Sequence, residues 1–221
     1  MEFETPIIIV GQGEVNLPAL RQMAKTYPII ALDGACHYLQ QHDIAASYVI
    51  GDMDSYNPPD DESLENPPVC LRMAEQDSND FEKAVRHFEA PIMIGFGLFG
   101  KRFDHSFANL HVMAKFQNNK AIIAVTNDEI ITTHKGACDL GAEKGGLIAI
   151  LPLQSISFMR SDGLAYPLDG LTLACGEMVS SSNQALSSEI SLVPETRSQH
   201  IAYAVCRPLS LLKPDKLTRL I

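Results

Sequence analysis

The sequence lacks tryptophan, and none of its five cysteines forms a C-x-x-C pair. Five widely spread cysteines are typical of free thiols in a reducing compartment, so we expect a cytoplasmic protein without a disulfide framework. No apolar run reaches the roughly 18 residues of a membrane span, and the first residues lack the features of a signal peptide. The sequence therefore predicts no membrane partner.

Positive charge is also scarce, because 17 basic residues face 27 acidic ones and the net charge is −10. Nucleic acid is not an expected partner, since binding to a phosphate backbone requires a basic footprint. No G-x-x-x-x-G-K-[ST] loop occurs, which excludes the commonest ATP-binding device. Gly11-Gln12-Gly13 begins like a dinucleotide fingerprint, but Asn16 replaces the third glycine, so a tight turn explains it equally well.

The apolar content of 46% is sufficient for a packed core. In the first half, short β-rich runs alternate with helical stretches, which is typical of a parallel sheet covered by helices on both faces. We expect strands at 6–10, 28–32, 47–50, 69–73, 91–94 and 120–125, and helices at 78–89 and 104–116. Ser78 is the expected N-cap of the first of these helices.

The second half has short β-prone pieces separated by turn residues, without a helical period, which indicates an antiparallel sandwich or barrel. We expect strands at 130–134, 147–153, 156–159, 171–175, 189–193 and 201–206. The sequence thus predicts an α/β domain over 1–127 and an all-β sandwich domain over 128–221. The segment 57–68, rich in proline, asparagine and acids, is either a lid or a solvated loop.

Paired carboxylates follow the expected strands. Asp52 and Asp54 come directly after one strand, and in extended geometry their side chains would point the same way. Asp77 and Asp80 bracket a helix start at a spacing that would put both on one helix face. Each pair alone could merely shape a turn or cap a helix. Together, at the carboxyl ends of parallel strands, they favour a shared Mg²⁺ site that could hold a phosphorylated ligand.

A glycine-rich turn at 95–100 leads into Lys101 and Arg102 at the start of a helix. Backbone amides, a helix start and two cations can together hold a polyphosphate, although a flexible turn with incidental cations is the alternative. His105, next to Asp104 and near Arg102, is a candidate contact to a phosphate or a base. These features favour a nucleotide as the ligand.

Several blocks in this order resemble signature sequences of the thiamine pyrophosphokinase family. In the first half they are Asp33-Gly34-Ala35 (family D-G-G), Gly51 to Ser55 (G-D-x-D-S), Gln76 to Lys83 (Q-D-x-T-D-F-x-K) and Gly100 to Asn109 (G-G-R-x-D-H-x-x-A-N). In the second half, Gly163 to Leu168 resembles G-L-x-Y-x-L, and Gly176 to Asn183 resembles G-x-x-x-S-x-S-N. The chain departs from the family at Ala35, Glu75, Asn79 and Lys101, of which Lys101 replaces the second glycine of its block.

The resemblance implies an α/β nucleotide domain followed by a thiamine-binding β-sandwich, in a homodimer with thiamine between domains of different subunits. It implies Mg²⁺-dependent transfer of diphosphate from ATP to the hydroxyethyl group of thiamine, giving thiamine diphosphate and AMP. It assigns the Mg²⁺ site to Asp52, Asp54 and Asp80, with Asp77 as a direct or outer ligand. It assigns the phosphate contacts to Lys83 and Arg102, and the lining of the nucleotide site to Asp33, Gln76, Asp104 and His105. The thiamine contacts that it implies are Ser180, Ser182 and Asn183.

Two other function classes are compatible with parts of this pattern. A D-x-D sequence after a strand also begins metal-dependent phosphohydrolases that form an aspartyl phosphate. A non-catalytic nucleotide sensor is the other alternative, but a pure sensor would gain little from so many carboxylates. Without tryptophan, any aromatic ring stacked on thiamine must be that of tyrosine or phenylalanine.

Overall fold

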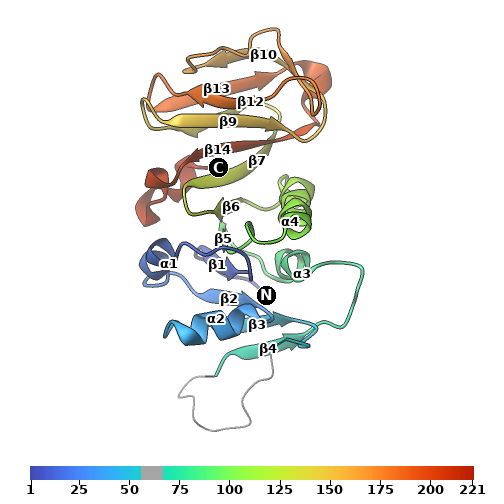
Figure 1. Ribbon diagram of the computed structural model, residues 1–221, viewed down its shortest axis with the longest axis vertical. Helices are drawn as coiled ribbons and strands as arrows, with labels where there is room; N and C mark the ends of the chain where they lie inside the picture. The colour runs from blue at the N-terminus through green and yellow to red at the C-terminus, as the bar shows by residue number, and fades with distance from the viewer. Residues whose placement is uncertain (56–66) are drawn as a thin grey trace. The chain divides into compact units, whose positions relative to one another are not determined.

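The computed structural model describes residues 1–55 and 67–221, which divide into two compact units (Figure 1). The first unit comprises residues 1–112 and 124–127, and the second comprises 113–123 and 128–221. The domain boundary expected after residue 127 stays a prediction. The second unit does take up the chain from residue 128, but it also includes the earlier segment 113–123. Of the segment 57–68, expected to be a lid or a solvated loop, residues 57–66 lie outside the described residues.

The first unit is built on a mostly parallel sheet with the order β6-β5-β1-β2-β3-β4. The pairs β1–β2, β1–β5, β2–β3 and β3–β4 are all parallel. Its strands are β1 (Ile7–Val10), β2 (Ile29–Leu32), β3 (Tyr48–Gly51), β4 (Val69–Arg72), β5 (Met93–Phe96) and the end of β6 (Ile122–Val125), whose first two residues group with the second unit. The chain order reverses between β1 and β5, and sheets of this kind bind ligands at such a switch point.

Helices cover both faces of this sheet, α1 and α2 on one side and α3 and α4 on the other (Figure 1). They are α1 (Leu17–Met23), α2 (Ala35–Gln41), α3 (Asp80–His87) and α4 (Phe103–Phe116). In the described part of the chain, no helix has both the length and the apolar character needed to span a membrane. The predicted α/β class is confirmed.

The N-cap expected for α3 is wrong by one residue. Asn79, not Ser78, caps this helix, because the Asn79 side chain accepts a hydrogen bond from the backbone N–H of Glu82 at 2.8 Å. The Ser78 hydroxyl instead donates to Glu75 at 2.9 Å. Serine and asparagine are both good caps, so composition alone could not choose between neighbours.

The second unit consists of two antiparallel sheets with the orders β12-β9-β14-β7 and β11-β10-β13-β8. The strands are β7 (Glu129–Lys135), β8 (Cys138–Gly141), β9 (Leu147–Pro152), β10 (Ile156–Asp162), β11 (Thr172–Leu173), β12 (Ser180–Gln184), β13 (Glu189–Pro194) and β14 (Ala202–Pro208). Short 3-10 helices lie at Thr196–Ser198, Leu209–Leu211 and Pro214–Arg219. β8 and β12 were not expected, since neither has a clear apolar alternation.

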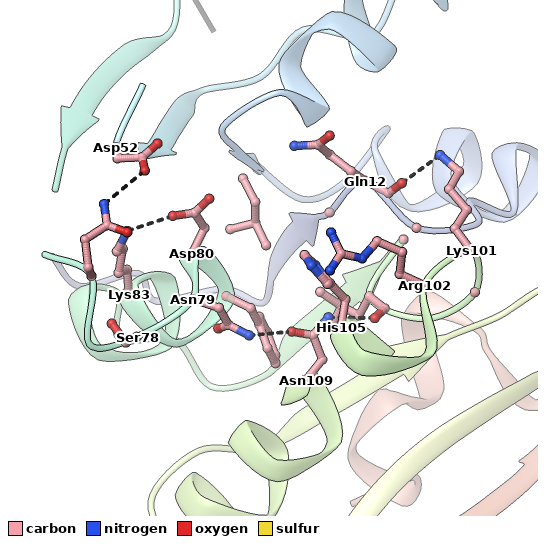
Figure 2. A pocket seen from close by; sticks show the side chains of 18 residues that line it. Gln12, Asp52, Ser78, Asn79, Asp80, Lys83, Lys101, Arg102, His105 and Asn109 are labelled. Atoms are coloured by element: carbon pink, nitrogen blue, oxygen red, sulfur yellow. Dashed lines mark hydrogen bonds and ion pairs between the residues drawn. The ribbon is translucent and has the colours of Figure 1, made fainter. Parts of the chain in front are cut away.

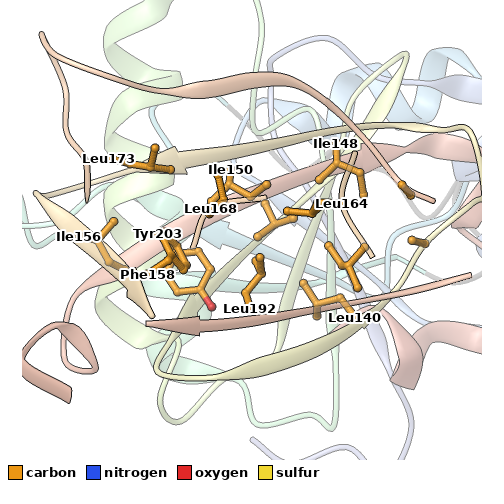
Figure 3. Packing of buried hydrophobic residues seen from close by; sticks show 14 residues of the cluster. Leu140, Ile148, Ile150, Ile156, Phe158, Leu164, Leu168, Leu173, Leu192 and Tyr203 are labelled. Carbon is orange, nitrogen blue, oxygen red and sulfur yellow. The ribbon is translucent and has the colours of Figure 1, made fainter. Parts of the chain in front are cut away.

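Apolar side chains from both sheets fill the space between them, which confirms the predicted sandwich (Figure 3). Phe158 and Tyr203 belong to this cluster, both fully buried, with their ring centroids 5.5 Å apart in an edge-on arrangement. The buried Tyr203 hydroxyl donates to the carbonyl of Gly136 at 2.9 Å. All five cysteines are free thiols; Cys36 and Cys206 are buried and Cys138 is half-buried, whereas Cys70 and Cys175 are exposed.

A polar group is buried at the β7 and β14 side of this unit. The Arg207 guanidinium, 1% exposed, donates to the carbonyl of Gly141 at 2.9 Å and to the Thr132 hydroxyl at 3.0 Å. His134 Nε2 lies 2.8 Å from the same hydroxyl oxygen. Burial, reinforced by the charge of Arg207, lowers the pKa of His134 to about 3. The imidazole is therefore neutral in the folded protein at ordinary pH.

Candidate active site

A pocket of about 520 Å³ opens at the carboxyl ends of β1 and β5 in the first unit, at the switch point of the sheet (Figure 2). Polar side chains from the turns after four strands reach it. The labelled lining residues are Gln12, Asp52, Ser78, Asn79, Asp80, Lys83, Lys101, Arg102, His105 and Asn109. Of the residues predicted from the sequence, the pocket therefore brings together Asp52, Gln76, Asp80, Lys83, Arg102 and His105.

Two glycine-containing turns form the wall of this pocket and are hydrogen-bonded to each other. The N–H of Gly13 donates to the carbonyl of Gly97 at 2.7 Å, and the N–H of Glu14 donates to that of Phe99 at 2.8 Å. A Cβ atom on Gly13 would lie 2.2 Å from the Phe99 oxygen, so only glycine allows this approach. The turn at 11–13, weak as a dinucleotide fingerprint, thus belongs to the site.

Three carboxylates from the turns after β2 and β3 lie together at the pocket. Asp33, Asp52 and Asp54 each offer an oxygen within 4.8 Å of the others. Asp33 is 2% exposed; its Oδ2 accepts the N–H of Ser55 at 3.2 Å, while its Oδ1 has no hydrogen-bond partner among the described residues. Burial raises the pKa of Asp33 above its usual value. A buried carboxylate oxygen without a partner is unusual, and its chemistry fits a hard cation as a ligand.

Asp52 and Asp54 meet by a different geometry from the extended one that the sequence suggested. Met53 between them has a left-handed backbone with φ of 64°, so the chain turns there instead of alternating. The N–H of Asp54 donates to Asp52 Oδ1 at 3.3 Å, and Gln76 Nε2 donates to Asp52 Oδ2 at 3.4 Å. Both bonds lower the pKa of Asp52, which favours its charged form.

Asp80 lies close to these carboxylates but is paired with a cation. Its Oδ1 accepts a hydrogen bond from Lys83 Nζ at 2.9 Å. A Cβ on Gly51 would lie 2.8 Å from Asp33 Cβ and 3.3 Å from Asp80 Oδ1, so this glycine lets the two acids approach. Asp77 precedes the first residue of α3, which contradicts the expectation that it shares a helix face with Asp80. Within the described residues, Asp77 is not part of the pocket lining.

The opposite wall carries Lys101 and Arg102. Arg102 Nε donates to Asp104 Oδ1 at 3.1 Å, in an ion pair that lowers the pKa of Asp104. The side chains of Arg102 and Asp104 are both well exposed. Among the described residues, His105 lines the pocket and Asp104 does not. Lys101 Nζ donates to the backbone carbonyl of Gln12 at 2.7 Å. The sequence offered Lys101 as one of two cations that could hold a polyphosphate, but it did not assign Gln12 or Asn79 to the site, although the glycines beside Gln12 were a signal.

In the second unit, the two predicted thiamine-domain motifs lie side by side. The buried Asn183 side chain accepts the N–H of Tyr166 at 3.0 Å and donates to its carbonyl at 2.7 Å. It also donates to the Ser180 hydroxyl at 3.3 Å. These bonds use both ends of the amide, so Asn183 holds the segment around Tyr166 in place. Ser182, on the same strand, is exposed.

Family models match both halves of the chain. Residues 20–125 match the thiamin pyrophosphokinase catalytic domain, and residues 131–196 match the thiamin pyrophosphokinase vitamin B1 binding domain. Thiamin pyrophosphokinase 1 of Caenorhabditis elegans is 26% identical over 183 residues, which cover 74% of this chain and 73% of that protein.

Solved structures share the fold. Thiamin pyrophosphokinase from Candida albicans has a TM-score of 0.78 at 16% identity, with 93% of this chain and 89% of that chain covered. The enzyme from Geobacillus thermodenitrificans has a TM-score of 0.73 at 21% identity, with coverages of 92% and 97%. With both domains matched in order, the chain belongs to the thiamin pyrophosphokinase family.

Proposed function

We propose that this chain, an enzyme of a family that synthesises thiamine diphosphate by pyrophosphoryl transfer, uses ATP as the donor and Mg²⁺ as the metal. The observation that carries the proposal is one pocket that combines glycine turns, carboxylates and cations at the switch point of the sheet. Amides and cations suit the phosphates, and the carboxylates suit a cation that bridges protein and phosphates.

The carboxylates fit Mg²⁺, a hard cation that prefers oxygen ligands. The unpartnered Oδ1 of buried Asp33 and the nearby oxygens of Asp52 and Asp54 offer the donor set. We propose that these three residues hold the ion with Asp80, and that Asp77 is an outer carboxylate. Gln76 keeps Asp52 oriented through its hydrogen bond. When bound, the ion would neutralise charge on the phosphate oxygens.

We assign Lys83 and Arg102 to the phosphates and His105 to the nucleotide. Each of the two cations already has a carboxylate neighbour, Asp80 for Lys83 and Asp104 for Arg102. These neighbours fix the direction of the cationic groups before the substrate arrives. Such preorganisation lets the protein stabilise charge in the transition state without rearrangement.

The proposed reaction forms one bond and breaks one. The primary hydroxyl of thiamine attacks the β-phosphorus of ATP, the bond from this phosphorus to the α-phosphate oxygen breaks, and AMP leaves. The hydroxyl proton passes to a carboxylate of the acidic group. Because the transition state is loose, positioning and electrostatic stabilisation supply most of the rate enhancement.

For thiamine we propose contacts from Ser180 and Ser182, whose hydroxyls can bond an aminopyrimidine edge. Asn183 acts by holding the segment around Tyr166, a residue that is 69% exposed. We further propose a homodimer in the cytoplasm, the compartment that suits five free thiols. Sedimentation at micromolar concentration tests the dimer.

The activity test is one incubation of the protein with Mg²⁺ and ATP, with and without thiamine, followed by mass detection of products. We expect equal amounts of AMP and thiamine diphosphate, and neither product without thiamine. Arg102→Ala should raise the KM for ATP about tenfold, because a phosphate contact is lost. Release of inorganic phosphate without thiamine would instead indicate a phosphohydrolase, and nucleotide binding without turnover would indicate a sensor.

A further inference from the structure

Lys101 has a left-handed backbone conformation, with φ of 56°. Residues with a Cβ atom rarely adopt this conformation, because Cβ comes too close to the following carbonyl oxygen. The preceding Gly100 has φ of 84°, so two successive residues are left-handed. A glycine at position 101 would avoid the strain. Strain of this kind persists only where the surroundings impose it, and it is frequent at functional sites.

The turn that leads into Lys101 is held by contacts with the turn after β1. The N–H of Glu14 donates to the carbonyl of Phe99 at 2.8 Å, which ties the turn before Lys101 to the turn after β1. A Cβ on Gly100 would lie 2.5 Å from Glu14 Cγ, so the two turns are in close contact. These contacts hold the residues just before Lys101, and Lys101 lines the pocket (Figure 2).

The hydrogen-bond partner of Lys101 differs from those of Lys83 and Arg102, the other two cations in the lining. Lys83 is paired with Asp80, and Arg102 is paired with Asp104. Lys101 Nζ, by contrast, is hydrogen-bonded to the neutral backbone carbonyl of Gln12 at 2.7 Å (Figure 2). A hydrogen bond between two charged groups is stronger than one between an ammonium and a neutral carbonyl. Exchange of the Gln12 oxygen for an anionic oxygen is therefore favourable.

We propose that Lys101 is a phosphate-binding residue that distinguishes polyphosphate from monophosphate nucleotides. On nucleotide binding, its ammonium leaves the Gln12 carbonyl and binds a non-bridging oxygen of the β- or γ-phosphate. The strained backbone is tolerated because it places an ammonium at this wall, where glycine would provide none. This inference rests on the proposed ATP donor and gives a selective role to Lys101, which the sequence offered only as one of two cations that could hold a polyphosphate.

The test measures nucleotide binding and thermal stability together. Lys101→Gly removes the charge and the strain, and Lys101→Asn removes the charge but keeps a residue that tolerates the left-handed region. Lys144→Gln is the control, because it changes the net charge equally at an exposed position of the second unit. Calorimetric titration uses α,β-methylene-ATP, which cannot be cleaved at the reacting bond, and AMP, both with Mg²⁺.

We expect both Lys101 variants to bind the ATP analogue about tenfold more weakly, with AMP binding unchanged. Both should melt at or above the wild-type temperature, and Lys101→Gly about 2 °C above it, because strain is released. Wild-type affinity in Lys101→Gly would overturn the inference. So would an equal loss for AMP, or a loss accompanied by a lower melting temperature, since either indicates an effect on pocket shape. If the wild-type protein binds AMP but not the analogue, the proposed donor itself is wrong.

Discussion

Asn79 and Asn109 connect two helices that flank the pocket: Asn79 Nδ2 donates to Asn109 Oδ1 at 3.0 Å. Asn79 caps α3 with its own oxygen, and the buried Asn109 on α4 donates to the carbonyl of Leu98 at 2.6 Å. The pair therefore joins the start of α3, α4 and the turn after β5. Asn79 occupies the position where the family pattern has threonine, which could cap α3 but has no amide to donate.

Asn109→Ala should lower the free energy of unfolding by about 2 kcal/mol, because it leaves buried polar groups without partners. Asn79→Thr should cost about 1 kcal/mol or less, since the cap is retained and only the link to Asn109 is lost. Urea denaturation of both variants measures the difference. Equal losses would mean that the link between the two amides accounts for the whole effect and that the buried hydrogen bond to Leu98 contributes nothing measurable.

Asp54→Asn should reduce turnover about 100-fold while the protein stays folded, because a proposed metal ligand is lost and Asp54 is exposed. The rate of thiamine diphosphate formation at saturating Mg²⁺ measures the effect. Asp139→Asn, an exposed acid in the second unit, is the charge-matched control. If the two variants are equally active, Asp54 does not hold the metal.

The stability of the second unit should decrease in acid because of His134. The pKa of His134 is about 3 in the folded protein, below its ordinary value of 6.5. Above pH 6.5 the imidazole of His134 is neutral in both the folded and the unfolded protein. As the pH falls below 6.5, the unfolded chain binds a proton that the folded chain does not, so the folded state loses about 2 kcal/mol by pH 5.

Urea denaturation at pH 7.5 and pH 5 measures this loss, and His134→Gln is the matched variant because it cannot take up the proton. The variant should lose less stability between the two pH values than the wild type by about the same 2 kcal/mol. Identical pH profiles would show that burial does not suppress the titration of His134.

Gly13→Ala should destabilise the first unit by more than about 3 kcal/mol, because the new Cβ would collide with the backbone of the facing turn. Gly145 is the comparison, since it has φ of 85° and a Cβ added there would meet nothing within 4 Å. Gly145→Ala should cost only the conformational strain, about 1 kcal/mol. Thermal melting of the two variants separates contact from strain, and equal losses would contradict the close packing of the turns.

Much of this fold follows from apolar patterning. The buried runs β1 and β2 were predicted because both of their faces are covered by helices, whereas β12 reads Ser-Ser-Ser-Asn-Gln and was missed. β12 is at the edge of its sheet, and it forms by pairing with β9 and not by burying an apolar face. Partner strands are distant in sequence, so a local pattern does not reveal them.

The candidate site was predictable where side-chain chemistry follows a strand, as for Asp52 and Asp80. It was not predictable where backbone shape decides. The approach of Asp52 to Asp54 depends on the left-handed Met53, and the contribution of Gln12 depends on the packing of one turn against another. Neither residue type prefers such a geometry, so only the tertiary contacts determine it.

The close packing of the turns at 11–13 and 97–100 also constrains how this protein can evolve. Because each backbone occupies the space that a side chain in the other would need, a mutation at Gly13 or Gly97 cannot be accommodated by one turn alone. We therefore expect adaptation to a different nucleotide to change side chains on or next to these two turns that line the pocket, above all those of Gln12 and Lys101. The contact between the two turns keeps their glycines unchanged, while the side chains that face the pocket can vary.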